Sequence, residues 1–192
     1  MNADKQAYIF DFDGVLVDTM EAHFACYRQA LAEAGVPIDK DQFYYQAGMT
    51  GREQIRYFAE KAGVKVDVEK VYARNQELKP FYADRITSIE SNIELLLTLR
   101  AAGHPVAIAT GSTERSIRPI MARFHIEVDA VATADNIQRG KPHPDLFLKA
   151  AERLGVDPKQ CTVVEDAEVG IQAAHAAGML AFRFVRKTLE QQ

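Results

Sequence analysis

Two aspartates that could do chemistry, Asp11 and Asp13, stand one residue apart directly after the short apolar run at residues 8–10. The run has the composition of a β-strand, and Gly14 follows the second acid. Burying unpaired carboxylates costs free energy, so this pair needs a partner. Ligands of α/β proteins bind at the carboxyl ends of the strands, which makes the pair a candidate functional site.

Polar residues also follow two other apolar runs that predict strands, at residues 106–109 and 162–164. Because the carboxyl ends of parallel strands meet at one edge of a sheet, we expect hydroxyls and carboxylates from all three strands to converge there. A lysine in a Gly-Lys-Pro loop is a candidate to join them. Besides the first two aspartates, the expected members are Thr110, Gly111, Ser112, Lys141, Glu165 and Asp166.

Carboxylates that lie this close repel one another unless a cation lies between them, and a set of oxygen ligands favours a hard ion, most simply Mg²⁺. Lys141, the hydroxyls of Thr110 and Ser112, and backbone N–H groups after Gly111 would hold a phosphate opposite the metal. Asp11 could then attack phosphorus and form an aspartyl phosphate. Asp13 would give a proton to the leaving alkoxide and later take one from water.

The elements that must position these residues fall into two groups. Between the first strand and residue 82 the patterns are helical only: a helix capped by Thr19, and helices at residues 52–62 and 67–78. A helical stretch placed after a first strand predicts an insertion, so we expect a helical cap domain at residues 20–82 and a catalytic core formed by residues 1–19 and 83–192.

After residue 82, helices and strands alternate. A possible capping box, Ser91 and Glu94, begins one helix, and Pro119 implies a kink or a late start in another. Further strands are expected at residues 130–133 and 181–185. This alternation predicts an α/β fold: a doubly wound parallel sheet, Rossmann-like, with helices on both faces and an inserted all-helical cap.

Composition narrows the function classes. The 192 residues are 47% hydrophobic and carry a formal net charge of -4, which does not indicate a nucleic-acid or anionic-lipid surface. Two distant cysteines predict no disulfide framework. No signal-peptide pattern or bilayer-length apolar run is present in the sequence, so the cytoplasm is expected, without nucleic-acid or membrane partners. A monomer or weak dimer is expected.

The ordered motifs DFDGVLVDT, TGS, GKP and VVED resemble the haloacid dehalogenase-like superfamily, in its branch of Mg²⁺-dependent phosphatases and phosphomutases. The resemblance covers essentially the whole chain. It implies that Asp11 is the nucleophile, that Asp13 is the acid/base, and that Lys141 neutralises charge. It also implies that Thr110 binds phosphate. The implied metal carboxylates are Asp11, Glu165 and Asp166, with Asp13 contributing its backbone carbonyl.

Within the superfamily, the helical insertion looks like that of the β-phosphoglucomutase-like group, and the closing segment is similar to fructose-1-phosphate phosphatase-type members. His23 and Arg52 stand where that group tends to have a cap-side histidine and a substrate-binding arginine. Two positions depart from the pattern. Thr113 stands where the mutases tend to carry a phosphate-gripping lysine, and Ala167 where relatives commonly have a serine near the metal.

The resulting hypothesis is an Mg²⁺-dependent phosphatase whose substrate is a small sugar phosphate similar to fructose 1-phosphate. A hexose phosphomutase similar to β-phosphoglucomutase is the first alternative. A sugar-phosphate-binding regulator without turnover is the second. Individual residues keep structural alternatives: Asp18 and Thr19 as a hinge and helix cap, His23 as an ordinary helix histidine, and Arg52 as a charge at a helix start.

Overall fold

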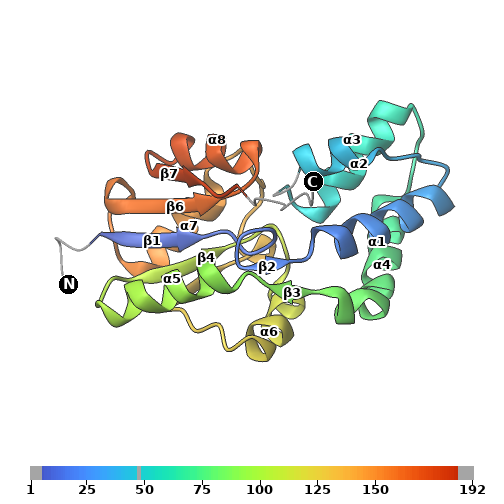
Figure 1. Cartoon of the computed structure of the whole chain (residues 1–192). Coiled ribbons are helices and arrows are strands. Elements are labelled where there is room, and N and C mark those ends of the chain that lie inside the picture. The colour runs from blue at the N-terminus through green and yellow to red at the C-terminus, as the bar shows by residue number, and fades with distance from the viewer. Residues whose placement is uncertain (1–5, 47–48, 186–192) are drawn as a thin grey trace, which may run out of the picture.

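The structure is a computed structural model that describes residues 6–46 and 49–185. Its centre is a sheet of five parallel strands in the order β5-β4-β1-β6-β7 (Figure 1). The order reverses direction on either side of β1, so the predicted doubly wound parallel sheet is confirmed. The strands are β1 (Ala7–Phe10), β4 (Val106–Ala109), β5 (Ala130–Ala132), β6 (Cys161–Glu165) and β7 (Leu180–Arg183).

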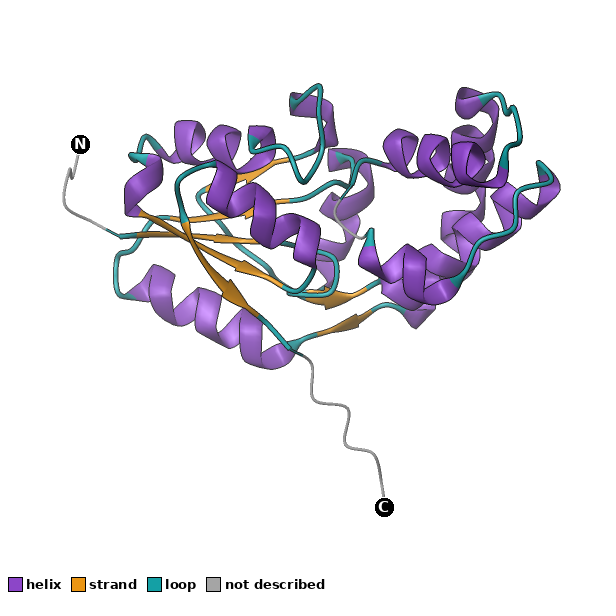
Figure 2. Cartoon of the chain, turned by 90° about the horizontal axis from the view of Figure 1, so that it is seen from above, coloured by secondary structure: helices purple, strands orange, loops and turns teal. Residues whose placement is uncertain are grey.

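Helices cover both faces of this sheet (Figure 2). Strand residues alternate between the two faces: Ile9 packs with the apolar side chains of α7 (Asp145–Leu154) and α8 (Glu168–Ala176). Phe10 packs instead with those of α5 (Glu90–Ala101) and α6 (Glu114–Arg123). Both faces are therefore buried, as expected of a parallel sheet.

Four further helices gather beyond the carboxyl ends of the strands (Figure 1). We call α1 to α4 the helical unit: α1 (Met20–Glu33), α2 (Lys40–Tyr45), α3 (Gly51–Ala62) and α4 (Val68–Leu78). The unit has its own apolar cluster, centred on Phe43, with Phe58 stacked against that ring. A 3₁₀ segment, η1 (Lys79–Arg85), follows α4. The domain boundaries after residues 19 and 82 stay a prediction, and residues 1–5 and 186–192 of the core lie outside the described ranges.

A two-stranded antiparallel ribbon, absent from the sequence-based expectation, joins the sheet to the helical unit. Val17–Asp18 (β2) pairs with Thr87–Ser88 (β3), so the chain enters and leaves the helical unit side by side. Strands of two residues are too short to show an alternating pattern, which explains why they were not predicted.

Two predicted details of the helices differ. The capping box of Ser91 and Glu94 is wrong: α5 starts earlier, after Ile89, whose backbone N–H donates to Leu16 O. The chain enters this helix directly from β3, so Ser91 already lies inside its first turn. Of the two outcomes predicted for Pro119, the late start is wrong, because α6 begins at Glu114 and contains the proline; the kink stays a prediction. Two short 3₁₀ turns, Ala134–Asn136 and Pro158–Gln160, complete the described elements.

No helix in the described part of the chain is long and apolar enough to cross a membrane.

Candidate active site

Three buried charged groups meet at the carboxyl ends of two neighbouring strands. Asp11 follows β1, Glu165 ends β6, and the two strands pair in parallel up to Phe10 and Val164. Lys141 Nζ donates to Asp11 Oδ1 at 2.7 Å and to Glu165 Oε2 at 2.9 Å. Lys141 and Glu165 are completely buried, and Asp11 is 3% exposed. The strand pairing thus brings together Asp11 and Glu165 of the first and fourth motifs, and the side chain of Lys141 from the third motif joins them.

A third carboxylate, Asp166, completes the cluster. One carboxylate oxygen from each of Asp11, Glu165 and Asp166 lies within 4.8 Å of the others. Oδ1 of Asp166 is buried and has no hydrogen-bond partner. Gly14 allows this close approach, because a Cβ on it would lie 2.2 Å from Asp166 Oδ2. A partnerless buried oxygen within an all-oxygen donor set fits a hard divalent cation such as Mg²⁺.

The electrostatics of the cluster point to the same conclusion. Burial and the charge of Glu165 raise the pKa of Asp11, and Lys141 offsets this only in part. Burial raises the pKa of Glu165, and burial together with Asp11 raises that of Asp166 to about 7. Burial opposes the charge of Lys141, yet Asp11 and Glu165 raise its pKa above the usual range. One lysine therefore does not balance three carboxylates, and a further cation would.

Asp13 lies in a different environment, surrounded by hydroxyls. Its Oδ2 accepts hydrogen bonds from Thr110 Oγ1 at 3.0 Å and from Ser112 Oγ at 2.9 Å. Its Oδ1 accepts from Thr19 Oγ1 at 2.5 Å and lies 3.8 Å from His23 Nε2. Thr110 and Ser112 follow β4, the strand that pairs with β1 on the side opposite β6. The order of the strands thus separates the hydroxyls from the carboxylate cluster.

These neighbours stabilise the ionised form of Asp13. Burial alone would raise the pKa of its carboxyl group, but His23, the hydrogen bonds from Thr19 and Ser112, and the charge of Lys79 together lower it. Burial lowers the pKa of His23, and Asp13 opposes that effect. The pKa values of the two aspartates of the first motif are therefore shifted in opposite directions, upward for Asp11 and downward for Asp13.

Thr19 does not cap the first helix with its side chain, contrary to the sequence-based expectation. Its backbone angles, φ -108° and ψ -10°, differ from the extended conformation of an ordinary N-cap residue. Its side chain accepts no hydrogen bond from the helix, and its fully buried hydroxyl donates to Asp13 instead. Thr19 therefore belongs to the site.

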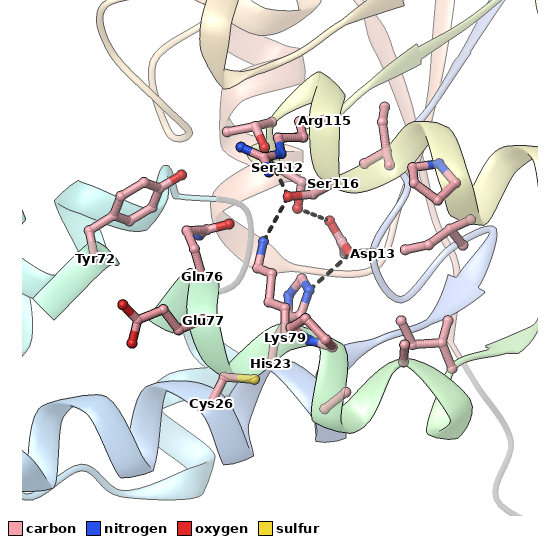
Figure 3. Close-up of a pocket in the computed structure, with 18 of the residues that line it drawn as sticks. Asp13, His23, Cys26, Tyr72, Gln76, Glu77, Lys79, Ser112, Arg115 and Ser116 are labelled. Atoms are coloured by element: carbon pink, nitrogen blue, oxygen red, sulfur yellow. Dashed lines mark hydrogen bonds and ion pairs between the residues drawn. The ribbon is translucent and has the colours of Figure 1, made fainter. Parts of the chain in front are cut away.

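A cavity of about 800 Å³ opens beside Asp13, between the helical unit and α6 (Figure 3). Its wall contains His23 from α1, Tyr72 and Gln76 from α4, and Ser112 and Arg115 from the core. A smaller adjoining cavity contains Asp11, Asp13 and Gly111. The adjoining cavities therefore link the nucleophile candidate to a space large enough for a small organic phosphate.

The sequence-based reasoning missed a cation in this cavity. Lys79 lies at the end of α4, lines both cavities, and donates from Nζ to Ser116 Oγ at 3.0 Å (Figure 3). Burial lowers its pKa, and the charge of Asp13 offsets part of that effect. A single lysine before Pro80 gives no periodic or motif signal. Its position at the junction of α4 and η1 brings it to the site.

The two cap-side residues behave differently. His23 Nε2 lies 3.8 Å from Asp13 Oδ1, and a substrate contact of His23 stays a prediction. Arg52 forms two hydrogen bonds to Glu69, at 2.7 and 2.9 Å, and its guanidinium lies 4.1 Å from the centre of the Tyr72 ring. Arg52 is not among the described residues that line the two cavities. A substrate role for Arg52 stays a prediction.

Fold and site together define an α/β enzyme with an acidic pair after its first strand and a carboxylate cluster that fits a metal. Residues 8–184 match the family model described as haloacid dehalogenase-like hydrolase. The chain belongs to this family.

Two relatives agree with this assignment, and a solved structure has a similar fold. The chain is 32% identical to fructose-1-phosphate phosphatase YqaB of Escherichia coli, covering 89% of this chain and 92% of that protein. It is 31% identical to β-phosphoglucomutase of Bacillus subtilis, and the match covers 92% of this chain and 81% of that protein. A crystal structure of a hydrolase from Pseudomonas syringae has a TM-score of 0.84 at 24% identity, and the match covers 92% of this chain and 82% of that one. The comparisons confirm the predicted family and support the predicted enzyme class, a phosphoric monoester hydrolase.

Proposed function

We propose that this protein is an Mg²⁺-dependent phosphatase that hydrolyses a small sugar phosphate through an aspartyl phosphate on Asp11. One observation carries the proposal. Asp11 takes part in two sites at once: it belongs to the buried carboxylate cluster, and it shares the smaller cavity with Asp13 and the phosphate-binding candidates Gly111 and Ser112. A nucleophile needs this position, between a cation site and a phosphate site.

The first step forms a bond between an Asp11 carboxylate oxygen and phosphorus and breaks the bond between phosphorus and the leaving alkoxide. Asp13 supplies the proton that the alkoxide takes. The hydroxyls of Thr110 and Ser112 now contact Asp13, and an arriving phosphate would compete for them. Losing two donors and gaining a neighbouring anion would both raise the pKa of Asp13, which favours the protonated form that this step requires.

In the second step water attacks the phosphorus of the aspartyl phosphate, Asp13 takes the proton of that water, and Asp11 is released as a carboxylate. Lys141 stays bonded to Asp11 Oδ1 and holds one carboxylate oxygen in place. Mg²⁺ bound by Asp11, Glu165 and Asp166 would keep these carboxylates ionised and offset negative charge on the phosphoryl group.

The cavity and the relatives support the proposed substrate class. The wall combines an apolar side, including Ile117 and Ile120, with the polar groups of Gln76, Glu77 and Arg115. Such a wall suits a short polyol or a sugar, whose hydroxyls can both donate and accept hydrogen bonds. The name of the Escherichia coli relative supports fructose 1-phosphate as the first compound to test.

A hexose phosphomutase remains the second candidate, and Lys79 is the observation that favours it. Thr113 supplies no charge where the mutases tend to have a lysine, and its hydroxyl bonds to Ser116 Oγ at 2.8 Å. Lys79 contacts that same serine. The cavity therefore contains a cation, Lys79, close to Thr113, the position at which the mutases tend to have a lysine. A phosphate bound in a second orientation could use this cation.

Product analysis separates the candidates. The purified protein with Mg²⁺ should release inorganic phosphate from fructose 1-phosphate or from another member of a sugar-phosphate panel. Formation of glucose 6-phosphate from β-glucose 1-phosphate, with little free phosphate, would show a mutase instead. Binding of a sugar phosphate without either product would leave the regulator hypothesis.

Asp11→Asn is the control for the mechanism. The variant keeps an oxygen that can accept from Lys141 but loses the nucleophile, so we expect turnover to fall by about 10⁴-fold or more. Circular dichroism and thermal unfolding should show that the fold is retained. Turnover near that of the unchanged protein would exclude a covalent intermediate on Asp11.

A further inference from the structure

One carboxylate of the helical unit contacts the core beside the catalytic lysine. Glu53 lies in the first turn of α3, and its Oε1 and Oε2 accept the backbone N–H of Gly140 at 3.0 and 3.2 Å. Gly140 directly precedes Lys141. The contact thus joins the helical unit to the loop that carries Lys141. In the described part of the chain, Lys141 is the positively charged side chain that donates to Asp11 and Glu165.

The same carboxylate also organises the start of its own helix. Glu53 Oε2 accepts from the backbone N–H of Thr50 at 2.9 Å and from the Thr50 hydroxyl at 2.5 Å. Three donors from two parts of the molecule therefore converge on one side chain. A carboxylate accepts them all, because it has two oxygens and no hydrogen of its own.

Gly140 fits the contact by lacking a side chain. A Cβ at this position would lie 2.4 Å from Glu53 Oε2 and 2.8 Å from the backbone nitrogen of Thr50. The second of these atoms belongs to the backbone and cannot rotate away. Any larger residue would therefore separate α3 from the lysine loop.

Apolar contacts support the same arrangement of the two parts. Ala167 and Val169, at the start of α8, belong to the apolar cluster of the helical unit. Ala167 also donates its backbone N–H to Glu165 Oε1, at 3.4 Å. The helical unit therefore touches the core beside both Lys141 and Glu165.

We propose that Glu53 is a positioning residue: its hydrogen bond to Gly140 couples closure of the helical unit over the cavity to the placement of Lys141. The inference rests on the proposed function, because its consequence is that Lys141 has the correct geometry at the nucleophile Asp11 when the helical unit is closed. Closure by itself is expected of a lid above a phosphate site. The coupling to this one amide is specific to the residues of this chain.

Two variants break the contact from opposite sides. Gly140→Ala leaves the bonds between Glu53 and Thr50 possible but prevents the close approach. Glu53→Gln keeps the length of the side chain, yet its amide nitrogen would face one of the N–H donors. Each should lower kcat/KM by about 10- to 100-fold, with most of the change in kcat. The double variant should be no worse than the poorer single one, because one contact is removed twice.

Asp67→Ala is the matched control. Asp67 caps α4 of the same unit by accepting from the Lys70 backbone N–H at 3.1 Å. Its loss should weaken a helix of the unit and leave kcat within about two-fold. If Asp67→Ala lowers kcat as much as Glu53→Gln does, or if the effects of the two contact variants multiply, Glu53 acts only on stability and the proposal fails.

A second measurement does not depend on turnover. The Gly140 amide should exchange its hydrogen with solvent slowly in the unchanged protein and about ten-fold faster in Glu53→Gln, whereas Asp67→Ala should leave the rate unchanged. Equal exchange rates in the unchanged protein and Glu53→Gln would overturn the coupling. A protein without phosphatase activity that still shows the difference would refute the proposed function and leave the contact established.

Discussion

The hydroxyl of Thr19 donates a hydrogen bond to Oδ1 of Asp13 over 2.5 Å, and Thr19 is fully buried. The bond links the acid/base candidate to the residue at which the chain leaves β2 and enters α1. The residue that precedes the helical unit therefore also orients the carboxylate of Asp13.

This contact predicts that Thr19→Val impairs catalysis more than folding. Valine matches the shape of threonine without the donor, so Asp13 loses one of the bonds that orient it. A hydrogen bond to a charged group contributes about 1.5–3 kcal/mol, and kcat should fall by roughly 10- to 100-fold. Thr19→Ser retains the donor and should recover most of the activity. Equal activity in the serine and valine variants would show that the hydroxyl has no catalytic role.

Mg²⁺ should stabilise the fold through the carboxylate cluster. A ligand that binds only the folded state at 100 times its Kd adds about 2.7 kcal/mol to the free energy of unfolding. We expect the melting temperature to rise with Mg²⁺ and to return after chelation, and Asp166→Asn should abolish most of the rise. Glu168→Gln is the matched control, because Glu168 is a nearby carboxylate that pairs with Arg183 at the surface. An equal loss in both variants would argue against a defined site at Asp166.

The approach of Asp166 to Gly14 predicts a difference between two glycine variants. Gly14 has φ +93° and Gly35 has φ +78°, so alanine strains the backbone at both positions. A Cβ on Gly35 meets nothing within 4 Å, whereas one on Gly14 meets Asp166. Gly14→Ala should weaken Mg²⁺ affinity by about 10- to 100-fold, and Gly35→Ala should only lower stability, by roughly 1–2 kcal/mol. Calorimetric titration with Mg²⁺ measures the difference, and equal affinities would contradict the steric argument.

The two cysteines predict a loss of stability at alkaline pH. Burial raises the pKa of the Cys26 and Cys161 thiols to about 11. An unfolded thiol has a pKa of about 8.5, so above that pH the unfolded chain releases protons that the folded chain retains. The free energy of unfolding should therefore fall between about pH 8.5 and 11, by on the order of 3 kcal/mol for each thiol, and not below that range. Thiolate absorbance near pH 8.5 in the folded protein would refute this.

Much of the fold was predictable because its signals are local. Short apolar runs followed by polar residues located the strands, and Gly and Pro located most helix ends. The carboxyl-end rule for parallel strands then predicts from the sequence alone that Asp11 lies near Glu165. Arg52 shows the limit of such reasoning, because its pairing with Glu69 depends on how α3 packs against α4.

The sequence by itself determined the class of fold and the identity of the acidic cluster, since both follow from periodicity and from motifs at strand ends. Only the tertiary structure decided the direction of the Thr19 hydroxyl, the arrival of Lys79 in the cavity and the bond between Glu53 and Gly140. Each of these depends on backbone conformation or on contacts between segments far apart in the chain. Such contacts produce no periodic pattern in the sequence, because they form only when the helical unit packs against the core.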